Sequence, residues 1–206
     1  MLTFIRYRLG ELLREYQIRK RYYNNPAFAK LDRALKKAYR FRNSFAIARK
    51  FHGTACYGET PLPILERLAK NCGLTKEDHI IELGAGRCRG AIFLNSLLNC
   101  KVTAVEIVPT FVQIARKHAP QSVFVQEEDL LTCDLKNATC IYLYGTSLSG
   151  ELIRKLCKKL RGHPAKIITV SYALKEYDTH FVTEKSWEEK FPWGRTKIVL
   201  QKSTSC

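Results

Sequence analysis

The first quarter of the chain has apolar residues at every third or fourth position, with arginine and glutamate between them. This spacing predicts two basic amphipathic helices within residues 1–52. The sequence YYNNPAF separates them, because Asn25 is suited to cap a helix and Pro26 to occupy its first position. The apolar stripes consist of Leu2, Ile5, Leu9, Leu12, Leu13 and Tyr16, and of Phe28, Leu31, Leu35, Ala38, Phe45 and Ala48.

From Gly53 onward, short apolar runs alternate with helical stretches. Thr60 and Pro61 begin a helix that runs to about Asn71 and ends at Gly73. The later pattern predicts strands at 79–83, 102–106, 123–125, 139–143 and 166–171, with helices at 90–98, 110–118 and 149–161 between them. Strands that begin roughly twenty residues apart indicate a parallel sheet with helical crossovers.

The end of the chain departs from this alternation. The sequence HFVTEKSWEEKFPWGRTKIVLQK predicts two strands joined by a turn around Pro192, Trp193 and Gly194. We therefore expect an α/β fold, with a parallel sheet, helices on both faces and a C-terminal antiparallel hairpin. The expected organisation is a basic helical extension over residues 1–52 and a main domain over residues 53–206.

The positive charge of the chain is concentrated in its first quarter. The 206 residues carry 35 lysines and arginines against 19 acids, a formal charge of +16. Residues 1–52 hold 14 of the basic side chains and three acidic ones, for a net charge of +11. The helices of this segment can pack on the main domain, attach to an anionic membrane surface, or form an electrostatic platform for an acidic partner.

The eight cysteines are scattered, without a C-x-x-C pair or a zinc-type spacing, so we expect no metal site. Several lie in apolar runs, where a free thiol behaves as a small hydrophobe. No run reaches the roughly 18 apolar residues of a membrane span, and the first residues lack the features of a secretory signal. We expect a soluble cytoplasmic protein in a reducing compartment, with peripheral membrane contact left open.

The segment HIIELGAGRCRGAIFL, residues 79–94, places three glycines between two apolar runs. In an open α/β sheet the turn after the first strand is the usual ligand cradle, and glycine lets a ligand approach the backbone closely. A P-loop is excluded because Ala91 and Ile92 follow Gly90, and a dinucleotide fingerprint would need glycine at Arg89. A packing turn without a ligand stays open at this point.

Acidic residues at successive strand ends narrow the choice of ligand. Glu82 lies at the mouth of the glycine loop, where its carboxylate would repel a pyrophosphate and favour a cationic group. S-adenosylmethionine has an ammonium group and a sulfonium, and no phosphate. Glu106 can accept both ribose hydroxyls, and Asp129 can accept from the adenine amino group. Together these acids predict S-adenosylmethionine as the cofactor.

At these residues the chain resembles a class I S-adenosylmethionine-dependent methyltransferase, which implies a Rossmann-like fold. It is most similar to the histone-lysine methyltransferases of the disruptor-of-telomeric-silencing type, which lack a SET domain. The segment YGETPLPILERLAKNCGLTKEDHIIELGAG resembles that family's pre-sheet loop, helix and glycine motif, and YGET is its most specific part. The segments ATCIYLYGTSLSGELIRKLCKKL, KIITVSYAL and PWGRTKIVL follow its later elements. The resemblance covers roughly residues 54–201.

The resemblance implies that the pre-sheet loop contacts the methionine end of the cofactor and that the strand ends hold the rest. The implied cofactor-binding residues are Tyr57, Gly58, Glu59, Thr60, Glu82, Gly84, Ala85, Gly86, Glu106, Asp129 and Leu130. The chain departs from the family at three places. Cys88 replaces the third glycine, so the backbone there should be restricted or shifted. Tyr144 and Gly145 replace paired asparagines, and Ile198 and Val199 fall where the family has an aromatic residue.

Methyl transfer from a sulfonium is an in-line displacement in which the enzyme aligns donor and acceptor and excludes water. A lysine acceptor must be neutral, and an aromatic channel lowers its pKa by desolvation. We predict protein lysine N-methylation, with Tyr57 and Tyr144 as catalytic channel residues. The alternatives are an RNA or lipid methyltransferase guided by the basic helices, or a non-catalytic S-adenosylmethionine-binding protein. Among the histidines, only His52, beside YGET, is a candidate site residue.

Overall fold

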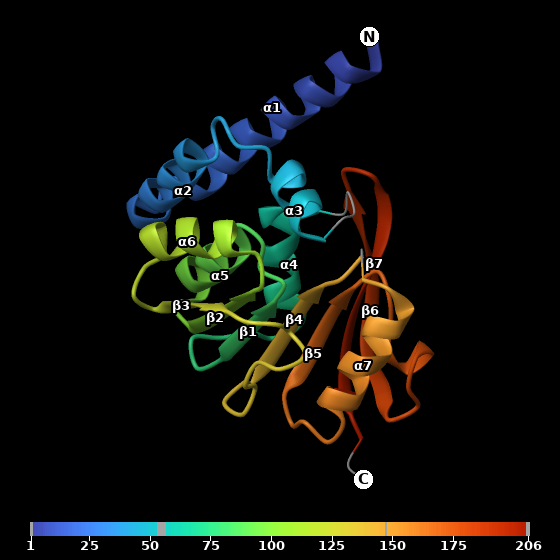
Figure 1. Ribbon diagram of the computed structural model, residues 1–206. Helices are drawn as coiled ribbons and strands as arrows, with labels where there is room; N and C mark the ends of the chain where they lie inside the picture. The colour runs from blue at the N-terminus through green and yellow to red at the C-terminus, as the bar shows by residue number, and fades with distance from the viewer. Residues whose placement is uncertain (1, 53–56, 147, 205–206) are drawn as a thin grey trace.

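The computed structural model describes residues 2–52, 57–146 and 148–204, and its strands form one sheet in the order β3-β2-β1-β4-β5-β7-β6 (Figure 1). The strands are β1 (His79–Leu83), β2 (Lys101–Glu106), β3 (Val123–Glu127), β4 (Cys140–Tyr144), β5 (Lys166–Val170), β6 (Phe181–Phe191) and β7 (Gly194–Ser203). Strands β1 to β5 are parallel, whereas β7 is antiparallel to both β5 and β6. The predicted parallel sheet with a C-terminal hairpin is confirmed.

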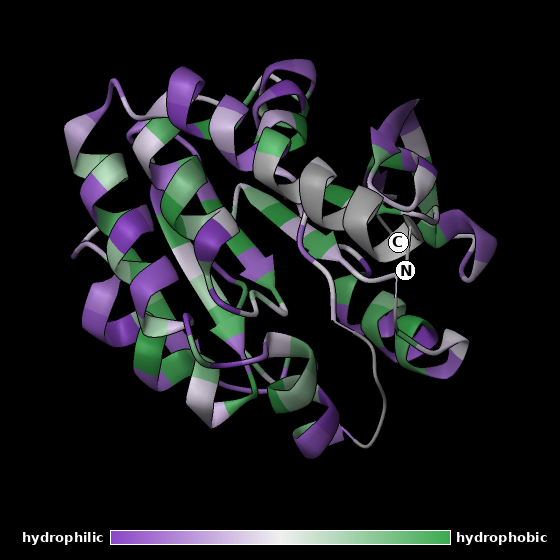
Figure 2. Cartoon of the chain, turned by 90° about the horizontal axis from the view of Figure 1, so that it is seen from above, coloured by the Kyte–Doolittle hydropathy of each residue, from purple (hydrophilic) through white to green (hydrophobic). Residues whose placement is uncertain are grey.

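Helices cover both faces of the sheet. One face is covered by α4 (Leu62–Asn71), α5 (Arg89–Leu98) and α6 (Pro109–His118), and the other by α7 (Gly150–Leu160) with the 3-10 helix η1 (Leu174–Glu176). Successive side chains of a strand point to opposite faces, so Ile80 packs in the first core and Ile81 in the second. Figure 2 shows the hydrophobic strands between helices whose outer faces are hydrophilic.

Residues 2–52, the described part of the N-terminal segment, form three helices, so the prediction of two is wrong. They are α1 (Leu2–Tyr22), α2 (Pro26–Ala38) and α3 (Ser44–His52). Asn25 caps α2 as predicted, because its side chain accepts a hydrogen bond from the N–H of Phe28 at 3.1 Å. The unexpected break precedes α3, where the Asn43 side chain accepts from the N–H groups of Phe45 and Ala46. That side chain competes with helix continuation and starts a new helix.

The helix α2 and the C-terminal part of α1 pack on the main domain. Phe28 and Tyr22 meet the ring of Phe93 on α5 edge-on, at centroid distances of 5.4 and 4.9 Å. The N-terminal end of α1 extends away from the sheet (Figure 1). Within the described residues, no helix combines the length and hydropathy that crossing a bilayer requires.

Candidate functional site

A cavity of about 490 Å³ opens at the carboxyl edge of the parallel strands. The ends of β1, β2 and β4 contribute to its wall, together with the starts of α6 and α7 and the inner side of α3. This is the edge where ligands of open α/β sheets bind. The cavity is lined by Ala48, His52, Tyr57, Gly58, Leu83, Gly84, Gly86, Val105, Glu106, Ile107, Val108, Phe111, Glu128, Asp129, Leu130, Leu143, Tyr144, Leu148, Ser149 and Leu152.

The glycine loop between β1 and α5 uses left-handed backbone at alternate positions. Gly84 and Gly86 have φ values of 70° and 55°, and a Cβ atom added at Gly84 would meet nothing within 4 Å. Cys88 keeps the same conformation, with φ 58° and ψ 18°, although it is not glycine. The buried Cys88 therefore holds a left-handed backbone conformation that costs a non-glycine residue about 1 kcal/mol.

Two of the predicted acids line the cavity from neighbouring strand ends. The Glu106 carboxylate accepts hydrogen bonds from the N–H groups of Gly86, at 2.7 Å, and Val108, at 2.8 Å. Burial raises the pKa of Glu106, and these two N–H groups oppose that rise. Asp129 is half-buried and accepts from the N–H of Leu131 at 2.8 Å. Glu106 thus fixes the glycine loop and still borders the cavity.

The third predicted acid, Glu82, lies behind the glycine loop in a much smaller cavity. Its side chain is buried, and its Oε2 atom has no hydrogen-bond partner among the described residues. Burial, together with the nearby carboxylates of Glu59 and Glu106, raises the pKa of Glu82 to about 8. A Cβ atom at Gly90 would lie 2.7 Å from Glu82 Oε1, so glycine makes room for this carboxylate. Glu82 is a buried acid that lacks a cation among the described residues.

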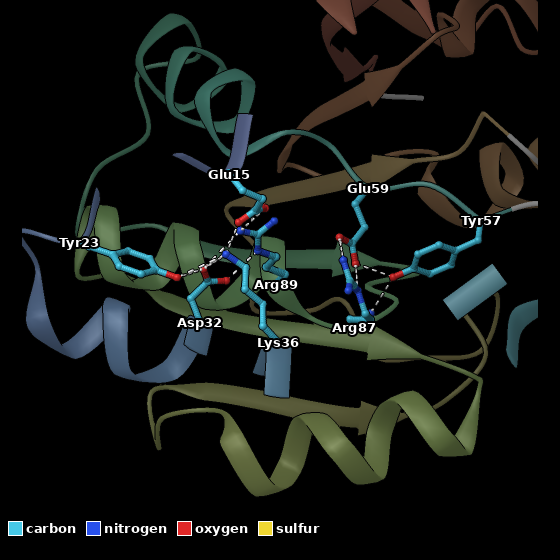
Figure 3. Close-up of polar contacts among 8 residues, drawn as sticks. All are labelled: Glu15, Tyr23, Asp32, Lys36, Tyr57, Glu59, Arg87 and Arg89. Carbon is cyan, nitrogen blue, oxygen red and sulfur yellow. Dashed lines mark hydrogen bonds and ion pairs between the residues drawn. The ribbon is translucent and has the colours of Figure 1, made fainter. Parts of the chain in front are cut away.

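The pre-sheet loop is tied to the glycine loop by an ionic contact (Figure 3). Arg87 donates two hydrogen bonds to Glu59, at 2.7 and 2.5 Å, and Tyr57 donates to the same carboxylate at 2.5 Å. Burial alone would raise the pKa of Glu59, but Arg87 lowers it below its ordinary value. Thr60 bonds to the hydroxyl of Tyr142. Glu59 therefore holds the loop in place, and its charge is already compensated.

The next arginine ties the same loop to the N-terminal helices (Figure 3). Arg89, at the start of α5, donates to Asp32 of α2 at 2.7 Å and lies 3.3 Å from Glu15 of α1. Lys36 lies 2.8 Å from Asp32, whose side chain is fully buried, and Tyr23 donates to the same carboxylate. The two arginines that flank Cys88 thus bind acids from outside the sheet.

Aromatic side chains line the end of β4. Tyr144 stacks on Phe191 at a centroid distance of 6.4 Å and meets Trp193 edge-on at 6.0 Å. Phe191 is the last residue of β6, and Trp193, which is 53% exposed, lies in the β6–β7 turn. Burial raises the pKa of Tyr144, so its hydroxyl stays protonated at neutral pH. The hairpin therefore completes an aromatic wall that starts at Tyr144.

Several solved structures resemble the chain. An RNA methyltransferase from Salinibacter ruber, in complex with S-adenosyl-L-homocysteine, is 21% identical with a TM-score of 0.57, over 72% of this chain and 94% of that one. A mutant of MtNAS, in complex with S-adenosylmethionine, is 18% identical with a TM-score of 0.60, over 91% and 76%. TrmN from Thermus thermophilus is 13% identical with a TM-score of 0.62, over 75% and 52%. The chain has the class I methyltransferase fold. The sequence itself matches no protein-family model and no curated protein.

In this methyltransferase fold the predicted site residues divide between the two cavities. Tyr57, Gly58, Gly84, Gly86, Glu106, Asp129, Leu130 and Tyr144 line the large cavity. Glu59, Thr60, Glu82 and Ala85 line only the small one, which also borders Gly58, Gly84 and Tyr144. His52 reaches the large cavity, as its sequence position suggested. Among the described residues there is no cluster of three or more possible metal ligands.

Sequence reasoning missed the apolar wall of the large cavity. Ile107 and Val108 follow Glu106 directly, and Phe111 and Leu148 come from the starts of α6 and α7. For Ile107 and Val108 the sequence did offer a signal, because both directly follow a predicted strand end. The contacts of Phe191 and Trp193 with Tyr144 had no local signal, because these residues lie far from Tyr144 in the sequence.

Gly58 lines both cavities, as do Gly84 and Tyr144. A Cβ atom at Gly58 would lie 2.7 Å from the Tyr144 hydroxyl, so Gly58→Ala must push this ring aside. We expect Gly58→Ala to lower S-adenosylmethionine affinity by about tenfold, a cost of ~1.4 kcal/mol, measured by calorimetry. Gly150→Ala is the control, because its Cβ would make only ordinary contacts, at 3.5 Å with Tyr177 and 3.6 Å with Arg154. Equal affinities for both variants would contradict the prediction.

Proposed function

We propose that this protein is an S-adenosylmethionine-dependent methyltransferase. The observation that carries the proposal is Glu82: a buried carboxylate without a cation among the described residues, beside a glycine loop and a cavity that Glu106 and Asp129 border. Burying an ionised carboxyl group costs free energy unless a cation pairs with it. The ammonium group of the methyl donor has the required charge. The complexes of two structural neighbours with S-adenosyl-L-homocysteine and S-adenosylmethionine support the same cofactor.

The residues present fit this cofactor along the carboxyl edge of the sheet. Glu82 would hold the ammonium group, Glu106 the ribose hydroxyls, and Asp129 with Leu130 the adenine. When bound, the cofactor supplies an electrophilic methyl group on a sulfonium. The loop at Tyr57 and the wall at Tyr144 exclude water and orient the acceptor, which are the main demands of a displacement reaction.

A lysine side chain as acceptor stays our first prediction for the substrate. It is supported by the aromatic wall of Tyr144, Phe191 and Trp193, because apolar surroundings favour a neutral amine. RNA is the second candidate. Two observations favour it: the basic N-terminal segment, and structural neighbours that include an RNA methyltransferase and the M1A22 tRNA methyltransferase TrmK.

The proposal is tested by calorimetry and by methyl labelling. We expect the protein to bind S-adenosylmethionine and not NAD, because the acidic residues beside the glycine loop would repel the pyrophosphate of NAD. Radiolabelled donor with fractionated cell extract then identifies the acceptor, since label in protein supports lysine and label in RNA supports the second candidate. Binding of NAD without binding of S-adenosylmethionine would overturn the proposal.

Glu106→Ala is the matching loss-of-binding variant. The change removes the acceptor of the Gly86 and Val108 N–H groups as well as the expected ribose contact. We expect donor affinity to fall by at least about tenfold, since hydrogen bonds to a charged group contribute ~1.5–3 kcal/mol. Glu127→Ala, on an exposed side chain that ends β3 and is not part of the cavity lining, serves as the control. Unchanged affinity in Glu106→Ala would remove this residue from the cofactor site.

A further inference from the structure

The second half of α2, the connection to α3 and α3 itself combine positive charge with exposed rings. Residues 33–52 contain seven lysines and arginines and no acid. Six of these cations are exposed, and none of the six has a carboxylate within ion-pair distance among the described residues: Arg33, Lys37, Arg40, Arg42, Arg49 and Lys50. We name this surface the α3 rim.

Three phenylalanines accompany these cations on the α3 rim. Phe41 is 91% exposed, Phe45 is 52% exposed and Phe51 is 45% exposed. The guanidinium of Arg40 lies over the ring of Phe41, 5.3 Å from its centroid. Exposed rings of this size have no role in the protein core, whereas rings among cations are the combination that binds bases and phosphates together.

The α3 rim borders the mouth of the large cavity. Ala48 and His52 of α3 line that cavity, and the ring of Phe45 meets Tyr57 edge-on at 5.7 Å. The helix α3 and the β6–β7 turn both lie at the carboxyl edge of the sheet (Figure 1). The turn adds the exposed Trp193, which contacts Tyr144 in the cavity wall. A chain docked on the rim therefore reaches the cavity.

We infer that the α3 rim docks a single-stranded nucleic acid whose bases stack on its rings and whose phosphates meet its cations. This inference rests on the proposed function and deepens its second candidate, an RNA acceptor. Charge complementarity carries it, because the exposed cations of the rim face no acid within the described part of the protein. The single-stranded form follows from the rings, since stacking needs unpaired bases.

A membrane surface fits the same residues less well. An interfacial helix presents its rings on one apolar face. Phe45 and Phe51 are six residues apart on α3, which places them roughly 120° apart around the helix axis. The helix has only 9 residues, and its Ala48 is buried against the protein. The rings are therefore spread around the rim, as stacking platforms can be, and do not form one insertion face.

Fluorescence anisotropy with a labelled single-stranded RNA of about 15 nucleotides tests the inference on the full chain. We expect Arg49→Glu with Lys50→Glu to weaken binding at least about tenfold and to flatten its salt dependence. The matched control is Lys158→Glu with Lys175→Glu, which changes the formal charge equally on exposed lysines of α7 and η1. Phe41→Ala removes an exposed ring and should weaken binding by about fivefold or more.

Three outcomes would overturn the inference. They are an equal loss of RNA affinity in the control variant, tighter binding of a duplex of the same length, and binding of anionic phosphatidylserine vesicles without RNA binding. Calorimetry with S-adenosylmethionine on the same variants separates this result from the proposed function. Rim variants that bind the donor normally but no longer bind RNA support the role of the α3 rim. A wild-type protein that binds RNA but not the donor refutes only the methyltransferase proposal.

Discussion

Replacing Glu82 with glutamine is expected to stabilise the ligand-free protein and to weaken its binding of S-adenosylmethionine. Burial and two neighbouring carboxylates raise the pKa of Glu82 from 4.5 to about 8. The folded protein therefore loses stability as the pH rises from about 4.5 to about 8, because the unfolded chain ionises this group more easily. At pH 7 that cost is about 3 kcal/mol. Glutamine removes it, and urea unfolding at pH 7 measures the gain.

The same substitution removes the partner of the donor's ammonium group. We expect affinity for S-adenosylmethionine to fall by about 10- to 100-fold, the value of a charge-assisted hydrogen bond. Wild-type affinity should also rise with pH between about 6 and 8, by up to about tenfold per unit, because Glu82 must lose its proton to pair with a cation. Glutamine should abolish this slope.

Glu77→Gln is the control for both measurements, because Glu77 is exposed and lies 3.8 Å from Lys76 at the surface. It should change neither urea unfolding nor donor binding. A Glu82→Gln protein that binds the donor as well as wild type, or that unfolds more easily than wild type at pH 7, would refute the role assigned to this carboxylate.

The strands and crossover helices were predictable because each consists of a short apolar run bounded by turn residues. Strand β1 matches its prediction at both ends, 79–83, and Ser149 caps α7 as expected. The break between α2 and α3 was not predictable from hydrophobic spacing, since Phe45 and Ala48 continue the stripe of α2. Only the capping bonds of Asn43 show that a new helix starts there.

The sequence placed the acids of the site at the correct strand ends, but it did not predict the direction in which each side chain points. Neighbouring residues of a strand point to opposite faces, so Leu83 lines the large cavity while Glu82 lies behind the loop against Gly90. Contacts between distant segments left no trace in the local pattern. Arg87 lies 28 residues from Glu59, and Arg89 lies 57 residues from Asp32.

Replacing Asp32 with alanine is expected to destabilise the whole protein by about 3 kcal/mol, because the change leaves the buried cation of Arg89 with only the Glu15 carboxylate, 3.3 Å away. The Arg89 side chain is 13% exposed and that of Asp32 is fully buried. Burial alone would raise the pKa of Asp32, but Arg89 and Lys36 lower it to about 2. This pair therefore stabilises the fold above about pH 4, and its contribution is lost as the pH falls towards 2.

Urea unfolding followed by circular dichroism distinguishes this arrangement from an independent N-terminal extension. Because Phe28 and Tyr22 pack on Phe93, residues 1–52 and the sheet should unfold in one transition, and Asp32→Ala should move that transition to lower urea. Glu151→Ala, which breaks the exposed pair with Lys155, should leave it unchanged. Two separate transitions, or equal midpoints for both variants, would contradict the coupling. A single shifted transition would mean that the basic helices hold the glycine loop through Arg89, so that the segment carrying the α3 rim and the cofactor loop form one cooperative unit.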